Sequence, residues 1–326
     1  MTEGSNRCMI GSVRIQNFKS IRDLQFEPTR VNLFIGEPNT GKSNVIEALA
    51  FFSLANAGNF KEIFRFKTTG DLFFDQKVAN EIVVQAGKWR FSLKFPGGSF
   101  QGSIVEDKIQ KGSFVLNHQG APSSAVFAQT SIRYYAFKPV ATFPNPKPGL
   151  LNPPFGDNLV AVLYSNEELR QRIGATFKAQ GFRLQLKPTE SELLIAKDVK
   201  DELYSYPWTT VSETLRRVAF FMAVLETNRE ASLLLDEPEA NTFPFYTKYL
   251  AERIALDTTN QFFVTTHNPY LLSSIVAKTQ TKDLSVFVTR MREFETKTSR
   301  VPEKRLPDLL ELDSDAFFNL NRLLDE

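Results

Sequence analysis

The sequence predicts an α/β fold built around a phosphate-binding loop, and three short segments carry this prediction. The first is a glycine-rich octet that follows an apolar run. The second is an apolar run that ends in two acidic residues, and the third is an apolar run that ends in histidine. They occupy residues 36–43, 233–239 and 262–267. A bound nucleotide needs all three parts: a cradle for phosphates, a site for metal and water, and a group that reaches the terminal phosphate.

The octet matches the pattern G-x-x-x-x-G-K-[ST] in full. Its residues are Gly36, Glu37, Pro38, Asn39, Thr40, Gly41, Lys42 and Ser43. The apolar run 31–35 predicts a strand before the loop, and apolar residues at helical spacing predict a helix after it. This strand–loop–helix context is what a phosphate-binding loop requires. A chance glycine-rich turn is the alternative interpretation.

Each residue type in the octet suits the phosphates of ATP. Successive backbone N–H groups of such a loop converge on phosphate oxygens, and the following helix adds its positive N-terminal end. We expect Gly36 and Gly41 to allow the turn and the close approach of the phosphates. We expect Lys42 to neutralise the β and γ phosphates and Ser43 to bind Mg²⁺. Asn44 completes the predicted nucleotide-binding set.

The other two segments supply the groups that hydrolysis needs. Asp236 ends a predicted buried strand, so we expect it to hold Mg²⁺ through water, and Glu237 is placed to polarise the attacking water. An acidic pair that caps a helix is the alternative. His267 ends the third apolar run and is expected to contact the γ phosphate, with a structural or capping role as the alternative.

The remaining sequence predicts a mixture of strands and helices. Short alternating runs in residues 81–136 indicate antiparallel strands, and the proline-rich residues 138–155 indicate a stiff loop. Further strands are predicted at 10–17, 183–186, 193–195, 232–236, 260–266 and 284–288. Helices are predicted at 158–178, 209–228, 243–256, after Pro269 and near 315–323.

Composition fits a soluble globular protein that works in a reducing compartment. The chain has 326 residues, is 42% hydrophobic, and carries a net charge of +2, which gives no general case for binding nucleic acid or membrane. Cys8 is the only cysteine, so neither a disulfide framework nor a cysteine metal site is expected. No signal peptide and no apolar run of about 18 residues is found, so we expect a cytoplasmic protein.

Four segments resemble the ABC-type ATPases of the SMC, RecF and OLD (overcoming lysogenization defect) group. They are residues 15–20, 42–49, 236–241 and 266–272, and residues 153–159 also resemble OLD-like ATPases. The resemblance implies an ABC-type head with a mixed sheet, an antiparallel β subdomain and a helical lobe. It implies one head over residues 1–326, with a nucleotide-binding core at 10–80 and 205–326 and an insert at 81–204.

The same resemblance assigns roles to single residues. Asp236 would be the Walker B aspartate, Glu237 the catalytic glutamate and His267 the switch histidine. In that group two heads sandwich the nucleotide, and a signature loop of one head meets the γ phosphate held by the other. Residues 211–217 are the best candidate for this loop, with Ser212 as the phosphate contact, although Thr214 stands near the place of the usual glycine. A simple helix cap at Ser212 is the alternative.

The family's glutamine loop has no clear counterpart. Gln76 is a weak candidate, and Arg65 is an alternative group near the phosphates.

What the chain lacks narrows the function. Fewer than 200 residues separate Lys42 from Asp236, with no long coiled coil, and the 59 residues after His267 are too few for the Toprim nuclease of OLD proteins. Residues 313–315 resemble a metal-binding D-x-D pair but are better interpreted as a helix cap. We therefore expect a stand-alone ATPase that forms homo-oligomers and controls a separate effector, a nuclease or toxin, in anti-phage defence.

Two other functions stay open at this point. A RecF-like DNA-repair ATPase would clamp DNA, with basic residues between 297 and 305 facing it. A nucleotide-gated scaffold would bind ATP with little turnover.

Overall fold

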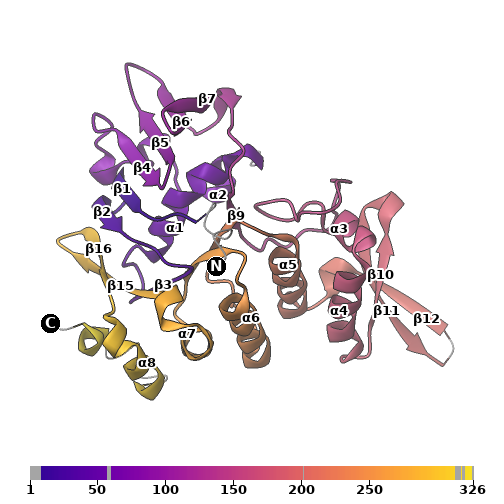
Figure 1. The fold of residues 1–326 in the computed structure, drawn as a ribbon. Helices are drawn as coiled ribbons and strands as arrows, with labels where there is room; N and C mark the ends of the chain where they lie inside the picture. Colours follow the sequence, from indigo (N-terminus) through magenta and orange to yellow (C-terminus); the bar gives the residue numbers. More distant parts are fainter. Residues whose placement is uncertain (1–8, 57–59, 201, 313–316, 318–319, 325–326) are drawn as a thin grey trace, which may run out of the picture.

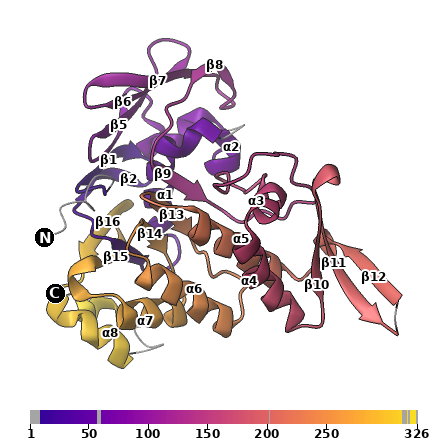
Figure 2. The ribbon, with the colours of Figure 1, turned by 45° about the vertical axis from the view of Figure 1, so that its right-hand side comes forward.

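The predicted α/β class is confirmed. The computed structural model describes residues 9–56, 60–200, 202–312, 317 and 320–324. These residues form a six-stranded, a seven-stranded and a three-stranded sheet, with helices packed against them (Figures 1 and 2). Within this described part of the chain, no helix has the length and apolar character needed to cross a bilayer.

The six-stranded sheet carries the three segments that the sequence singled out. Its strand order is β16-β15-β3-β14-β13-β9. The strands are β3 (Val31–Ile35), β9 (Ile132–Tyr135), β13 (Ser232–Asp236), β14 (Gln261–Thr265), β15 (Leu284–Arg292) and β16 (Glu295–Arg300). All neighbours are parallel except β15 and β16. Because parallel strands end at the same edge, the loops after β3, β13 and β14 meet there.

The seven-stranded sheet is antiparallel, in the order β2-β1-β4-β5-β6-β7-β8. Its strands are β1 (Val13–Phe18), β2 (Ile21–Phe26), β4 (Ile82–Ala86), β5 (Trp89–Lys94), β6 (Phe100–Glu106), β7 (Ile109–Leu116) and β8 (Pro122–Val126). Strands from both sides of residue 80 therefore share one sheet, and the division into core and insert stays a prediction.

Helix α1 (Lys42–Ala50) joins these two sheets into one body. Its apolar residues belong to a buried cluster that includes Phe34 and Phe263 of the six-stranded sheet and many residues of the antiparallel sheet. Phenylalanine rings fill this cluster. The ring of Phe51 stacks on that of Phe91 with centroids 3.9 Å apart. The many phenylalanines of the sequence thus have a packing role here.

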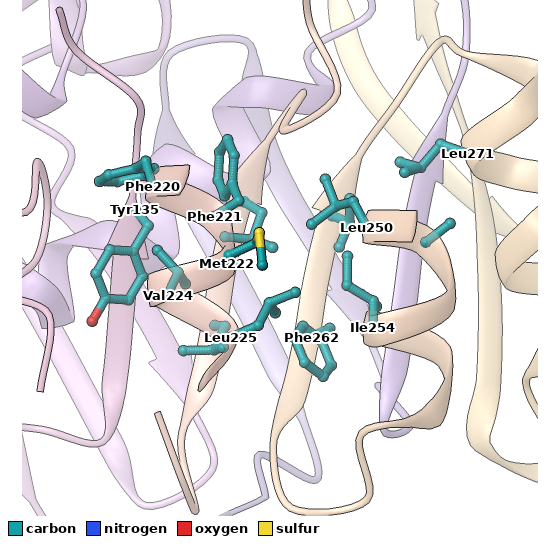
Figure 3. Packing of buried hydrophobic residues seen from close by; sticks show 14 of the residues in the cluster. Tyr135, Phe220, Phe221, Met222, Val224, Leu225, Leu250, Ile254, Phe262 and Leu271 are labelled. Carbon is teal, nitrogen blue, oxygen red and sulfur yellow. The ribbon is translucent and has the colours of Figure 1, made fainter. Parts of the chain in front are cut away.

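The other face of the six-stranded sheet is covered by helices. These are α5 (Glu213–Thr227), α6 (Pro244–Leu256) and α7 (Pro269–Lys278). Helices α3 (Leu159–Ser165) and α4 (Glu167–Lys178) pack beside α5, and α8 (Leu306–Leu312) packs against α7. Figure 3 shows α5 and α6 meeting through side chains such as Met222 and Leu250, above Phe262 of the sheet. The three-stranded sheet, β10 (Arg183–Lys187), β11 (Glu192–Val199) and β12 (Glu202–Pro207), projects beside α4 (Figure 1).

Short helices complete the described residues. They are α2 (Phe60–Ile63) and the 3-10 helices Phe51–Asn56, Thr69–Leu72, Phe74–Gln76, Pro188–Glu190, Trp208–Thr210, Thr281–Asp283, Glu303–Arg305 and Leu320–Leu323.

Several details differ from the sequence-based expectation. The last strand of residues 81–136, β9, pairs in parallel with β13 instead of joining the antiparallel strands. The helical segment 158–178 is broken at Asn166, whose side chain accepts from the backbone N–H of Leu169 at 3.0 Å and starts α4. Strands β2, β12 and β16 and helix α8 were not predicted. Residues 313–315 lie outside the described residues, as do 316, 318 and 319 of the predicted final helix, and a 3-10 helix spans Leu320–Leu323 in its second half.

Candidate nucleotide-binding site

The glycine-rich loop lies where β3 ends and α1 begins, and its glycines are required by the geometry. Gly36 has φ +153°, and a Cβ there would lie 2.3 Å from the carbonyl oxygen of Thr289. Gly41 has φ +93°, and a Cβ there would lie 2.0 Å from Thr296 Oγ1. No side chain larger than hydrogen fits at either position without displacing β15 or β16. The antiparallel pair β15–β16 therefore supports the loop from outside.

Lys42 is buried and held against the loop. Its Nζ donates to the carbonyl oxygens of Gly36 and Glu37, each at 2.8 Å. Burial lowers the pKa of Lys42, and the negative charges of Glu237, Asp236 and Glu37 oppose this shift. The ammonium group is thus fixed beside the loop, near acidic residues of the loop and of the end of β13.

Ser43 and Asp236 form the predicted metal-binding pair. Ser43 Oγ donates to Asp236 Oδ1 at 2.9 Å, and Thr265 Oγ1 donates to the same oxygen at 2.5 Å. Burial raises the pKa of Asp236, while the hydrogen bonds from Thr265 and Ser43 lower it. A hydroxyl and a carboxylate oxygen are the hard ligands that Mg²⁺ prefers, so the donor set fits this ion. When bound, Mg²⁺ neutralises phosphate charge.

Glu237 and His267 face each other across the ends of β13 and β14. His267 Nδ1 lies 3.0 Å from Glu237 Oε1, and the His267 side chain is 61% exposed. The backbone N–H of Glu237 donates to Thr265 Oγ1 at 3.0 Å, which fixes the start of the segment after β13. The contact therefore joins the segments that follow β13 and β14, at the edge of the sheet that carries the loop.

A pocket of about 390 Å³ lies beside the loop and extends to Glu237, whereas Asp236 and His267 are not among its lining residues. It is lined by Ser20, Pro38, Asn39, Thr40, Gly41, Lys42, Ser43, Asn44, Arg65, Glu237 and Met291. Seven of the predicted nucleotide-binding residues, Pro38 to Asn44, thus line the same space as the predicted catalytic glutamate. Ser20 and Met291 were not predicted as site residues. They come from the β1–β2 turn and from β15, whose approach to the loop no local pattern announces.

Arg65 lines the pocket, as one of the two alternatives expected, whereas Gln76 does not. Arg65 Nε donates at 2.7 Å to Oε1 of Glu47, a residue of α1 that is 3% exposed. Lys19 Nζ pairs with the other oxygen of Glu47. Burial lowers the pKa of Lys19, and Glu47 counters that shift. Gln76 instead donates to Asp71 Oδ1 at 3.0 Å. The sequence did not predict that Glu47 and Lys19 form a charge cluster with Arg65 beside the pocket.

Ser212 lies away from the pocket of its own chain. It is exposed and caps α5, with its hydroxyl accepting from the N–H of Leu215 at 3.4 Å. Thr214 Oγ1 donates to the carbonyl oxygen of Asn241 at 2.8 Å. Within one chain Ser212 acts as a helix cap. Its contact with a nucleotide on another head stays a prediction.

The basic stretch near the C-terminus is partly neutralised. Lys297 pairs with Glu295 at 2.6 Å, and Arg305 pairs with Asp308 at 3.1 Å.

Comparison with solved structures identifies the architecture. The SMC head bound to the C-winged helix domain of ScpA matches with a TM-score of 0.53 and 15% identity, over 91% of this chain and 99% of that one. The SMC head with an extended coiled coil, bound to the C-terminal domain of ScpA derived from Pyrococcus furiosus, matches with a TM-score of 0.51 and 15% identity, over 93% and 98%. The fold is that of an SMC-type ATPase head. The predicted ABC-type head fold is thereby confirmed.

Two family models match separate parts of this head. The model described as "AAA ATPase domain" matches residues 9–112, which contain the phosphate-binding loop. The model described as "AAA domain, putative AbiEii toxin, Type IV TA system" matches residues 146–273, which contain Asp236, Glu237 and His267. Together with the fold, these matches support a P-loop ATPase of the ABC/SMC type.

One curated relative shares a short segment with the head. The uncharacterized protein MJECL10 of Methanocaldococcus jannaschii is 42% identical over 53 residues. These cover 16% of this chain, which spans about a quarter, 24%, of the relative's length.

Proposed function

We propose that this SMC-type head binds ATP with Mg²⁺ and hydrolyses it to ADP and phosphate. The observation that carries the proposal is the pocket itself. Every residue from Pro38 to Asn44 lines it together with Glu237. The Ser43–Asp236 pair, at 2.9 Å, lies at the loop's helical end. Charge neutralisation and positioning account for most of the catalysis of phosphoryl transfer, and these groups supply both.

Each group has a distinct part in this reaction. The loop N–H groups and Lys42 bind the β and γ phosphates, and Ser43 and Asp236 would hold Mg²⁺. Glu237 accepts a proton from the attacking water, which makes its oxygen a better nucleophile. His267 lies 3.0 Å from Glu237. Its proposed part is to hold that carboxylate in place and to contact the γ phosphate.

Phosphate release by the purified protein tests this proposal. Wild type should release phosphate over many turnovers when ATP and Mg²⁺ are present. Lys42→Ala should lose ATP binding, because Lys42 is the one lysine of the octet and the variant has no positive side chain there to neutralise the phosphates. Glu237→Gln should bind ATP and fail to turn it over, because an amide does not take the proton. Unchanged ATP affinity in Lys42→Ala contradicts the site assignment, and a wild type that binds without turnover points to a nucleotide-gated scaffold.

We further propose that these heads act as oligomers that control a separate effector in anti-phage defence. The resemblance of the motifs to OLD-like ATPases supports this context, and so does the match of residues 146–273 to a model named for a toxin system. Ser212 is exposed at the start of α5, where another head can reach it.

Affinity purification tests the effector and the oligomer together. Glu237→Gln protein from its native host, held with ATP and Mg²⁺, should co-elute with a nuclease or toxin and with further copies of itself. Co-elution with nucleic acid and no effector favours the RecF-like clamp.

A further inference from the structure

The segment after β13 carries a second carboxyl group to which the proposed mechanism gives no part. Glu239 is 3% exposed. Its Oε1 accepts a hydrogen bond from Thr266 Oγ1 at 2.5 Å, and its Oε2 is buried without a hydrogen-bond partner among the described residues. A buried carboxyl group with an unsatisfied oxygen costs free energy, so its presence needs an explanation.

Thr266, the partner of Glu239, closes the turn that carries His267. Thr266 is fully buried, and its Oγ1 also accepts from the backbone N–H of Asn268 at 3.0 Å. One hydroxyl group therefore both closes the turn 266–268 and ties it to Glu239. His267 lies between Thr266 and Asn268, the two residues that this hydroxyl connects. The direction of its exposed ring therefore depends on the turn.

The sheet register places these groups in two layers. Asp236 pairs with Thr265 across β13 and β14, so the residues that follow each strand face each other. The exposed layer is the contact of Glu237 with His267 at 3.0 Å, and the buried layer is the hydrogen bond of Glu239 with Thr266. Both contacts join the segment after β13 to the segment after β14. The buried hydrogen bond therefore helps to hold Glu237 and His267 in contact.

We infer that Glu239 is a positioning residue of this site: through Thr266 it fixes the turn 266–268 and so sets where the His267 ring lies relative to Glu237. The kinetic part of this inference rests on the proposed ATP hydrolysis, whereas the structural part does not. A shift of about 1 Å in a catalytic group can cost on the order of 100-fold in rate. Loss of the buried anchor of the histidine turn can therefore lower the rate of hydrolysis strongly.

The charges around Glu239 agree with an anchoring role. Burial raises the pKa of Glu239 to about 7, the hydrogen bond from Thr266 lowers it, Glu237 raises it and His267 lowers it. The carboxyl oxygen that faces Thr266 accepts a hydrogen bond whether the group is neutral or ionised. Glutamine offers the same acceptor, so Glu239→Gln should keep the anchor, and Glu239→Leu should remove it.

Nuclear magnetic resonance of histidine rings tests the inference without nucleotide. The chain contains two histidines. The second, His118, contacts the rings of Phe95 and Phe100 far along the antiparallel sheet and serves as an internal reference. With ¹⁵N-labelled histidine, the ring signals of His267 should move toward those of a free imidazole in Thr266→Val and Glu239→Leu. They should stay in place in Glu239→Gln and Thr266→Ser.

The reference signals separate an anchoring effect from misfolding. Signals of His118 should match wild type in all four variants. If Glu239→Leu also moves His118, the smaller change Thr266→Val decides. Unmoved His267 signals in folded Thr266→Val overturn the inference.

Steady-state hydrolysis adds a second, separate measurement. Thr266→Val should lower kcat on the order of 10-fold with KM for ATP nearly unchanged, because binding groups are untouched while a catalytic group is displaced. Thr247→Val is the matched control. Thr247 is a buried threonine of α6, 1% exposed, and its hydroxyl contacts that of Thr242 instead of Glu239. An equal loss in Thr266→Ser and Thr266→Val contradicts the role of the hydroxyl. Absence of hydrolysis in wild type overturns the proposed function alone, because the ring signals still decide on Glu239.

Discussion

Replacement of Glu239 by glutamine should change how the stability of this head depends on pH. Burial raises the pKa of Glu239 from 4.5 to about 7. Well below pH 4.5 the group is protonated in the folded and the unfolded chain, so its ionisation makes no difference to stability. As pH rises, the unfolded chain loses this proton first, and the folded state becomes progressively less stable until the folded carboxyl ionises as well. Glutamine has no such dependence.

The size of the effect follows from the two pKa values. One pKa unit corresponds to about 1.4 kcal/mol. Between pH 5.5 and pH 8 the ionisation of Glu239 should therefore reduce the free energy of unfolding of wild type by about 2 kcal/mol relative to the variant. For a chain of 326 residues this corresponds to about 3 °C in Tm. The unpaired amide of glutamine adds a cost of about 1–3 kcal/mol that is the same at every pH.

Thermal unfolding of both proteins without nucleotide, at pH 5.5, 6.5 and 8, measures this difference. The Tm of Glu239→Gln should gain on that of wild type steadily as pH rises. Glu62→Gln is the control, because Glu62 is an exposed residue paired with Lys138, and its difference from wild type should not follow this course. A constant difference between wild type and Glu239→Gln across the three pH values refutes the reasoning, since it means that the carboxyl group is not buried as described.

Three further outcomes follow from the packing and the site. Phe91→Ala should lower the free energy of unfolding by about 3–5 kcal/mol in urea titrations, because its fully buried ring stacks on Phe51; a loss below 1 kcal/mol contradicts that burial. Gly41→Ala should weaken ATP binding at least about tenfold in calorimetry, because its Cβ meets β16 and its φ is positive, whereas Gly11→Ala, with open space around it, should leave it unchanged. Asp236→Asn should raise the Mg²⁺ concentration for half-maximal hydrolysis at least about tenfold, and chelation of Mg²⁺ should stop turnover of wild type; equal Mg²⁺ curves would falsify its role as a ligand.

Local patterns were sufficient for the strand, loop and helix around the glycine-rich octet. The octet predicts a loop between a strand and a helix, and the spacing of apolar residues predicts β3 and α1 on either side of it. The meeting of Ser43 with Asp236 also follows, because parallel strands bring their carboxyl ends to one edge. These predictions succeeded because each depends on a few neighbouring residues or on a general rule of sheet geometry.

Non-local pairing explains what was missed. Residues 132–135 alternate like the antiparallel strands before them, and only their pairing with β13 makes them part of the six-stranded sheet. Strand β2 is short and half polar, so its place beside β1 depends on the ladder and not on its composition. Glu47 looks like any polar residue of a helix. Its contacts with Lys19 and Arg65 arise only when turns from different parts of the chain close over α1.

The short segment after β13 connects the nucleotide pocket to the start of α5. Glu237 lines the pocket, Glu239 anchors the histidine turn, and the carbonyl oxygen of Asn241 accepts from Thr214 on α5. In the proposed oligomer, Ser212 at the head of that helix meets the nucleotide of another head. A displacement of α5 there acts on Asn241, which lies four residues from Glu237 along a segment fixed by hydrogen bonds at both ends. If the heads assemble and hydrolyse ATP as proposed, these contacts would carry the approach of a second head to Glu237 and His267, which is a physical route for hydrolysis to depend on assembly.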